Sequence, residues 1–405
     1  MAVVMTVSLA ACGGASSGNS TSKGEASSSD KGSGDVFKVG AFLPLSGASA
    51  AYGIEARNAI ELAIAHVNEN GGFNGKDVKL VAYDTQCSVE EAVKVVSKLI
   101  DEEKVDAMIG SIISSEIFAA GNAVNNAGVY MLGLGTSATW MEEDWPYVYR
   151  AAMNNGAAAP TMADMLGELK YESVAAFYGQ DDAALSTYQA FKSACEDEGI
   201  DILVSESYDQ GDTDYSAQVT NIINSGADCV YISVIGETAP IIVKQLRQYG
   251  YTGIIFDKES FMASQVSIAG EGNSDYIVFV NPYVTYESIE DIEIEQVKDF
   301  AERYKEAYGD INKTDSAYRG WDAIMVMWEA SKIAGANDSE SLKDATNKIS
   351  GMEGLGGNID FTSGNREGYN DYNAFLLKDG KNVLWSNWVK DGGYDDFLAK
   401  TDREK

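Results

Sequence analysis

Residues 105–137, VDAMIGSIISSEIFAAGNAVNNAGVYMLGLGTS, decide the fold. Their pattern predicts an apolar strand over residues 107–109, a helix that opens near Ser114, and a second apolar strand over residues 129–132. In open α/β sheets, ligands bind outside the carboxyl ends of the parallel strands. The residues that follow the two strands are therefore candidate ligand contacts, namely Ser114, Gly135, Thr136 and Ser137.

Ser114 occupies the position of a helix N-cap in this pattern. Its hydroxyl and the first free amides of the helix can together bind an anion such as a carboxylate. Ser137 offers a second hydroxyl, and Gly135 lets backbone groups approach a ligand closely. A serine before a helix is, however, usually a cap and nothing more, so a structural role accounts for the same residues.

The composition indicates a soluble globular protein with a strong negative charge. A length of 405 residues suits two domains, and 45% of the residues are hydrophobic. The sequence has 30 Lys and Arg against 62 Asp and Glu, which gives a formal net charge of −32. Such a charge repels nucleic acid and anionic lipid headgroups, so we expect no nucleic-acid partner.

The N-terminus predicts a targeting signal. Residues 1–12 are apolar up to Cys12, and Leu9-Ala10-Ala11-Cys12 resembles a bacterial lipobox. Residues 13–35 are rich in Gly and Ser, as expected of a disordered tether. We therefore expect lipidation of Cys12 and anchoring to the outer face of the bacterial cell membrane. No Lys or Arg precedes Cys12, which departs from a signal peptide, so we expect the natural start to lie upstream.

The remaining cysteines and the single histidine predict no metal site and no catalytic triad. Cys87, Cys195 and Cys229 are far apart and form no Cys-x-x-Cys motif. His66 lies inside a helical pattern without a histidine or cysteine partner. We expect neither a cofactor nor enzymatic activity.

Strands and helices alternate along the chain. The first half of the pattern predicts strands over 37–43 and 78–83 and helices over 50–69 and 90–101. Beyond residue 170 it predicts strands over 172–178, 201–205, 229–234 and 254–256, and helices over 185–198, 215–224, 239–249, 295–308 and 321–334. This alternation indicates parallel sheets covered by helices.

Residues 39–87 resemble the opening of the branched-chain amino-acid (Leu/Ile/Val) binding proteins of ABC importers. The resemblance rests on the P-L-S-G-x-x-A-x-Y-G loop from Pro44 to Gly53 and on the N-E-N-G-G-F-N-G-K turn from Asn68 to Lys76. It continues to about Trp388. It implies the type I periplasmic binding protein fold, in which two doubly wound parallel-sheet lobes are joined by a three-strand hinge. The implied N-terminal lobe comprises residues 36–155 plus 283–370, and the C-terminal lobe comprises residues 156–282 plus 371–405.

The resemblance also implies ligand contacts. The groups that hold an amino acid's carboxylate and ammonium map onto Ser114, Gly135 and Ser137, and Asn155 falls where an acidic residue can sit. In the C-terminal lobe, the acidic residue that meets the ammonium maps onto Glu259. The family's aromatic pocket walls fall near Ala183, Val234 and Ile235, so other aromatic residues could line the pocket: Tyr52, Trp140 and Tyr318. The family's disulfide maps onto Cys87 and Ile113, so we predict no disulfide.

The resemblance implies a monomer that delivers a small amino acid, branched-chain or similar, to a permease and its ATPase. An alternative is an extracellular sensor that presents a non-amino-acid solute, such as an amide, aromatic acid or nucleoside, to a receptor. Two motifs suggest other functions. Gly133 to Ala138 matches the G-x-G-x-x-A dinucleotide fingerprint, and Asp209, Asp212 and Asp214 resemble calcium ligands but lack the glycine and terminal glutamate of an EF-hand.

Overall fold

The computed structural model describes residues 36–208, 212–259, 261, 263–270, 272–286, 288–292, 294–370 and 372–401, without the side chains of Asn155 and Ala263. The predicted signal, Cys12, the tether and Asp209 lie outside these residues. Within them, no helix combines the length and apolar character needed to cross a membrane.

The first of two main sheets has five parallel strands in the order β2-β1-β3-β4-β5. They are β1 (Phe37–Leu43), β2 (Val78–Asp84), β3 (Ala107–Gly110), β4 (Tyr130–Gly133) and β5 (Val148–Arg150). β3 and β4 are buried along their whole length, as expected of central strands with helices on both faces.

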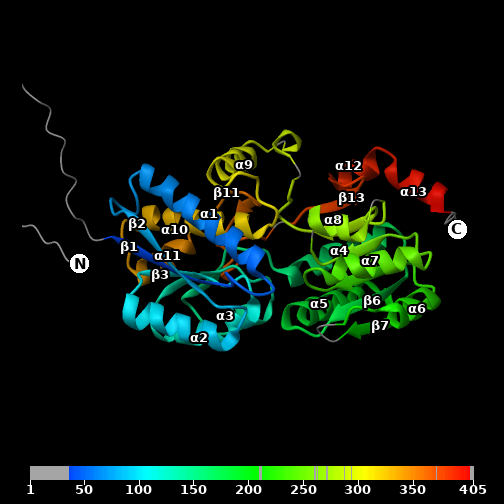
Figure 1. Ribbon diagram of the computed structural model, residues 1–405, viewed down its shortest axis with the longest axis horizontal. Helices are drawn as coiled ribbons and strands as arrows, with labels where there is room; N and C mark the ends of the chain where they lie inside the picture. Colours follow the sequence, from blue (N-terminus) through cyan, green and yellow to red (C-terminus); the bar gives the residue numbers. More distant parts are fainter. Residues whose placement is uncertain are drawn as a thin grey trace, which may run out of the picture. The chain divides into compact units, whose positions relative to one another are not determined.

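Helices cover both faces of this sheet (Figure 1). One face packs against α1 (Ala50–Glu69), α9 (Glu295–Tyr308), α10 (Ser316–Ala334) and α11 (Ser339–Thr346), and the other against α2 (Val89–Lys98) and α3 (Ser114–Asn126). Residues of β1 alternate between the two cores, because successive side chains of a strand point to opposite faces. Val39 and Ala41 join the first core, and Phe42 joins the second.

The second main sheet has seven strands in the order β14-β13-β10-β9-β8-β6-β7. These strands are β6 (Ser173–Gly179), β7 (Asp201–Tyr208), β8 (Cys229–Ser233), β9 (Ile255–Asp257), β10 (Ile277–Val280), β13 (Ala374–Lys378) and β14 (Lys381–Leu384). The expectation of a parallel sheet is wrong at one edge, because β13 runs antiparallel to both β10 and β14. A two-residue turn joins β13 to β14, and such a short connection permits only antiparallel pairing.

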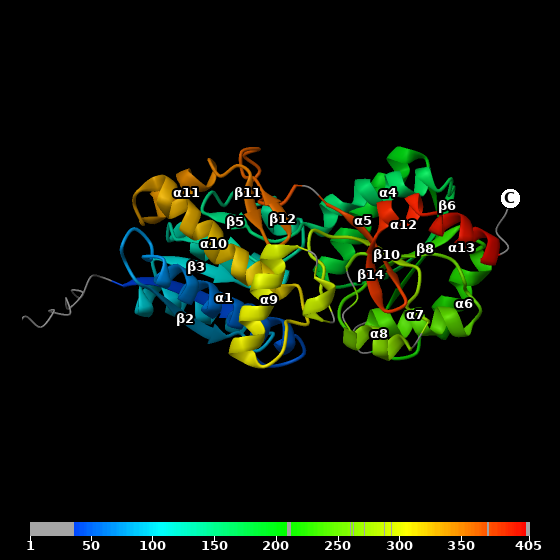
Figure 2. The same cartoon turned by 90° about the horizontal axis from the view of Figure 1, so that it is seen from above.

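Helices also cover both faces of the second sheet (Figure 2). One core contains α4 (Ala159–Glu168), α5 (Asp182–Glu198), α12 (Trp385–Lys390) and α13 (Gly393–Thr401), and the other contains α6 (Ser216–Ser225), α7 (Thr238–Gln248) and α8 (Ala263–Ala269). A hairpin of β11 (Met352–Gly354) and β12 (Gly357–Ile359) completes the described strands. The predicted fold of two α/β lobes is confirmed, whereas the residue boundaries of the lobes stay predictions.

Several element ends differ from the predicted ones, and two helices show how. The helix predicted over 90–101 ends at Lys98 and continues as one π-helical turn, Leu99–Glu103. The helix predicted from residue 321 begins at Ser316. The prediction began it too late, because Asp315 directly before the helix and Arg319 within it interrupt the apolar pattern.

Asp322 of α10 connects the segments that cross between the two sheets. Its carboxylate accepts hydrogen bonds from the hydroxyls of Tyr283 (3.3 Å) and Tyr369 (2.5 Å), and from the amide of Leu355 (3.0 Å). The hydroxyl of Tyr283 also lies 3.4 Å from the carbonyl oxygen of Ala151. Residues 151, 283 and 369 belong to the three crossing segments, so the buried carboxylate binds two of them directly and the Tyr283 hydroxyl contacts the third.

Burial raises the pKa of Asp322 to about 6. The folded protein thus holds the proton more tightly than the unfolded chain does, and the resulting stability is present below pH 4 and lost as the pH rises through 6. We expect the free energy of unfolding to fall by up to about 3 kcal/mol over this range, relative to Asp322→Asn. Urea unfolding at several pH values measures this difference. Equal pH slopes for the two proteins would contradict it, and the exposed Asp197→Asn is the control.

Gly53 lets helix α1 pack directly on the Pro44 loop. A Cβ at residue 53 would lie 2.0 Å from the carbonyl oxygen of Pro44. Gly53→Ala is therefore expected to destabilise the protein by about 1–3 kcal/mol, although alanine favours a helix. Thermal or urea unfolding measures the loss. Gly167→Ala in α4 is the matched control, because no atom lies within 4 Å of its added Cβ, and it should be neutral or slightly stabilising.

Candidate ligand-binding site

The carboxyl ends of β3 and β4 meet through two serines. Ser114 Oγ accepts a hydrogen bond of 3.1 Å from the backbone amide of Ser137. A Cβ on Gly135 would lie 2.7 Å from Ser114 Oγ, so glycine is required for this close approach. Ser114, Thr136 and Ser137 are each at most 5% exposed. The structure therefore brings the four residues predicted from the first stretch into one cluster.

The N-cap assignment of Ser114 is wrong. Helix α3 begins at Ser114 itself, and Ile113 occupies the cap position without any side-chain cap. The Ser114 hydroxyl instead reaches the loop after β4, which lies 23 residues further along the chain. The capping rule cannot anticipate this contact, because the partner belongs to another strand.

Two buried arginines hold the carbonyl groups of the same loop. Arg150 Nη1 donates to the carbonyl oxygens of Gly135 (3.2 Å) and Ser137 (2.7 Å). Arg319 Nη1 donates to the carbonyl oxygen of Leu134 (3.1 Å). The two guanidinium groups thus fix the loop through its carbonyl oxygens.

An ion pair balances the charge of Arg150. Arg150 Nε lies 2.7 Å from Glu367 Oε2, Nη2 donates to Oε1 at 2.9 Å, and Arg150 is completely buried. The guanidinium lies 4.5 Å from the ring centre of Trp140, which is itself buried. The Trp140 ring therefore packs against the guanidinium of Arg150 within the core.

The loop after β4 also contacts α5, which packs on the second sheet. Ser137 Oγ and Ser186 Oγ are 3.1 Å apart, and Thr139 Oγ1 donates to Asp182 Oδ2 at 3.1 Å. Ser137 thus belongs to the predicted carboxylate site and also to a contact between the two lobes.

Glu259 follows β9 in the second lobe and is paired with its neighbour. Lys258 Nζ lies 2.5 Å from Glu259 Oε1, and the Lys258 side chain is wholly buried, whereas that of Glu259 is 29% exposed. Burial, and then the charge of Glu259, raise the pKa of the Tyr52 hydroxyl. Glu259 therefore acts electrostatically on Tyr52, which belongs to α1 of the first lobe.

Asp315 and Arg319 of α10 are charged residues beside the same cluster that the sequence reasoning missed. Arg319 Nε and Nη2 donate to Asp315 Oδ2, and the two residues are 5% and 7% exposed. The Ser316 hydroxyl donates to the carbonyl oxygen of Tyr52 at 2.8 Å. The signal in the sequence was two opposite charges spaced four residues apart at the start of an apolar helix.

Tyr318 lies in the core rather than in the cluster. It is 2% exposed and stacks on Tyr283 with ring centres 5.8 Å apart. Asn155 begins the short 3-10 helix Asn155–Ala158, and its side chain is outside the described part. The ligand roles of Tyr52, Tyr318, Asn155 and Glu259, like those of the serine cluster, stay predictions.

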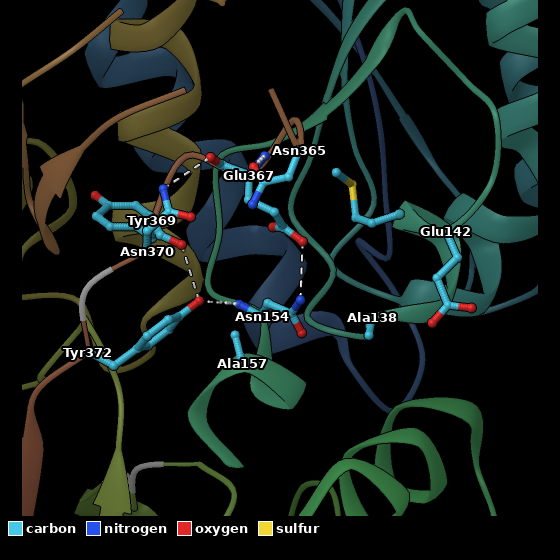
Figure 3. A pocket seen from close by; sticks show the side chains of 10 residues that line it. Ala138, Glu142, Asn154, Ala157, Asn365, Glu367, Tyr369, Asn370 and Tyr372 are labelled. Atoms are coloured by element: carbon cyan, nitrogen blue, oxygen red, sulfur yellow. Dashed lines mark hydrogen bonds between the residues drawn. The ribbon is translucent and has the colours of Figure 1, made fainter. Parts of the chain in front are cut away.

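A hollow of about 360 Å³ lies beside the crossing segments (Figure 3). Its wall includes Ala138, Asn154, Glu367 and Tyr372. Asn154 Nδ2 donates to Glu367 Oε1 (3.1 Å), and the Asn154 amide donates to the Tyr372 hydroxyl (3.1 Å), as the dashed lines in Figure 3 show. Among the residues whose side chains are described, none of the predicted ligand residues lines this hollow, and its polar groups tie two crossing segments together.

The structure gives little support to dinucleotide binding or to metal binding. The dinucleotide fingerprint requires a helix after its last glycine, but the chain forms only the three-residue 3-10 turn Thr139–Met141. Over the described ranges, no three His, Cys, Asp or Glu side chains are grouped to hold a metal. Cys87, Cys195 and Cys229 carry free thiols.

Residues 36–382 match the sequence profile of the periplasmic binding protein family. The chain belongs to this family. An "Amino acid binding protein" of Pseudomonas aeruginosa is 26% identical over 58% of this chain and 63% of its own length. A "Leucine-, isoleucine-, valine-, threonine-, and alanine-binding protein" of the same organism is 24% identical over 59% of this chain and 65% of its own length. The alignments with these two relatives thus span less than two thirds of each relative.

Among solved structures of the family, a leucine-binding protein from Thermotoga maritima is 25% identical. It has a TM-score of 0.73, covering 86% of this chain and 97% of that chain. The predicted family and its type I fold are confirmed, and these relatives are substrate-binding proteins rather than enzymes.

Proposed function

We propose that this protein is the extracytoplasmic solute-binding component of an ABC importer and captures a small amino acid, branched-chain or similar, between its lobes. One observation carries the proposal. The buried serine cluster at the ends of β3 and β4 touches the second lobe through the Ser137–Ser186 contact of 3.1 Å. A solute held at this cluster can therefore influence how the two lobes meet.

The amino acid's carboxylate would bind at Ser114, Gly135, Thr136 and Ser137, where Arg150 and Arg319 hold the carbonyl groups of the β4 loop. Its ammonium would meet Glu259. The carboxylate of Glu259 already pairs with Lys258, and the ammonium would be a second cation on it. Since the two charged groups of the solute then contact opposite lobes, the solute favours the closed form, and binding shifts the population towards it.

The closed form would dock on a membrane permease coupled to an ATPase. A lipid at Cys12 would hold the protein, as a monomer, at the outer face of the cell membrane. Mass spectrometry of the membrane fraction tests the anchor directly, and Cys12 without lipid would rule it out.

A second candidate is a sensor protein that binds a solute without an ammonium group. The Lys258–Glu259 pair favours this alternative, because the carboxylate already holds a buried cation at 2.5 Å. In that case Glu259 would position Lys258, and Lys258 would face the solute.

A thermal-shift screen of the purified protein against amino acids, amides, aromatic acids and nucleosides distinguishes the two candidates. A ligand at about a thousand times its Kd adds about 4 kcal/mol to the native state, which appears as several degrees of Tm shift. We expect amino acids alone to shift Tm, and Ser114→Ala, but not the exposed Ser193→Ala, to reduce the shift. Shifts caused only by other compounds would favour the sensor.

A further inference from the structure

We propose that the Asp315–Arg319 pair borders the solute site and recognises a neutral polar group on the solute's side chain. The solute would then be an amino acid that carries an amide or a hydroxyl rather than a purely aliphatic one. This inference rests on the proposed function and specifies the solute at the same site.

The position of the pair places it beside the serine cluster. Arg319 Nη1 binds the carbonyl oxygen of Leu134, the residue directly before Gly135. Ser316, which follows Asp315, binds the carbonyl oxygen of Tyr52. The start of α10 is therefore attached both to the β4 loop and to α1, and each of these contains predicted ligand residues.

The second lobe also acts on this pair. Burial opposes the charge of Arg319, but the carboxylates of Asp315 and Glu259 raise its pKa. The charges of Glu259 and Asp315 raise the pKa of the Tyr52 hydroxyl, and the charge of Arg319 lowers it. The Asp315–Arg319 pair and Glu259 thus affect the same hydroxyl, that of Tyr52, although they come from opposite lobes.

The pair has hydrogen-bonding capacity to spare. An arginine has five N–H groups. Within the described residues, three of those on Arg319 donate, to Asp315 and to Leu134, which leaves one N–H on each Nη nitrogen. Asp315 accepts through Oδ2, and in the same part of the chain its Oδ1 receives no hydrogen bond. The pair therefore offers donors and an acceptor side by side, with no net charge.

This combination matches an amide or a hydroxyl, each of which both donates and accepts. A solute methyl group placed against the buried pair would leave N–H groups and a carboxylate oxygen unpaired, and an unpaired buried polar group typically costs about 1–3 kcal/mol. Sites built to hydrogen-bond a substrate group strongly reject the analogue that lacks it. The pair therefore selects for polarity rather than for size.

Isothermal titration with near-isosteric amino acids tests the inference. L-asparagine is compared with L-leucine, and L-threonine with L-valine, so that each pair exchanges a polar group for methyl groups at similar volume. We expect the polar member of at least one pair to bind about 100-fold more tightly. The asparagine and threonine arms distinguish an amide from a hydroxyl.

A double variant, Asp315→Leu/Arg319→Met, removes both charges together, so that no unpaired charge stays buried. We expect the preference for the polar member to fall below about tenfold in this variant. Arg319→Lys keeps the charge but loses the planar guanidinium, and it should weaken the preference as well. Circular dichroism verifies that each variant is folded.

Each outcome has a distinct meaning. If leucine and valine each bind the native protein as tightly as their polar counterparts do, the inference is overturned while the proposed function stands. If no amino acid binds, both are overturned. A preference that survives in a folded double variant would also overturn the inference, and the native comparison decides alone if that variant does not fold.

Discussion

Glu259→Gln is expected to weaken amino-acid binding about 100-fold or more. Truncating one partner of a buried charge pair typically costs about 2–5 kcal/mol, and 1.4 kcal/mol corresponds to a factor of ten in Kd. Glutamine keeps the size of the side chain but loses the charge that would meet the ammonium. Isothermal titration with the tightest amino acid measures the change, and Glu198→Gln, exposed on α5, is the matched control.

The pairing with Lys258 requires a second variant. Glu259→Gln leaves the wholly buried Lys258 without its acidic partner, so the variant will also lose stability. Lys258→Met/Glu259→Gln removes both charges, and its affinity should be as low as that of Glu259→Gln alone. Unchanged affinity in either variant, measured well below Tm, would exclude the ammonium role of Glu259.

The sequence predicted the elements that apolar periodicity defines. The strand at residues 37–43 and the helices at 50–69 and 295–308 have the predicted ends. The direction of β13 and β14 was not predicted as antiparallel, because the pattern of a single strand contains no information about its neighbours. Helix α10 was predicted five residues too short for a different reason, since two buried charges interrupted the period that marks a helix.

The small residues of the candidate site could be predicted from the sequence, but the contacts of its buried charged residues could not. Ser114, Gly135 and Ser137 could be chosen because strand ends locate ligands in α/β sheets. The partner of Arg150 could not be predicted from the sequence. Glu367 lies 217 residues away, and the contact exists only once the crossing segments have come together. The same holds for Arg319 and the carbonyl of Leu134, which are 185 residues apart.

Arg150→Met is expected to lower the free energy of unfolding by about 3–5 kcal/mol, because it leaves the carboxylate of Glu367 buried and unpaired. Urea unfolding measures the loss. The matched control is Arg303→Met, which breaks an exposed pair with Asp299 and should cost at most about 0.5 kcal/mol. Arg150→Met/Glu367→Leu should recover part of the stability, since it removes both charges.

Solute binding separates a general loss of stability from a specific role of Arg150 in the β4 loop. The guanidinium holds the carbonyl oxygens of Gly135 and Ser137, and a methionine cannot replace either hydrogen bond. The double variant should therefore regain stability without regaining affinity, because the loop stays unanchored even when the charge imbalance is removed. If affinity returns together with stability, the loop does not depend on Arg150, and the serine cluster keeps its geometry through Ser114 and the packing of Gly135 alone.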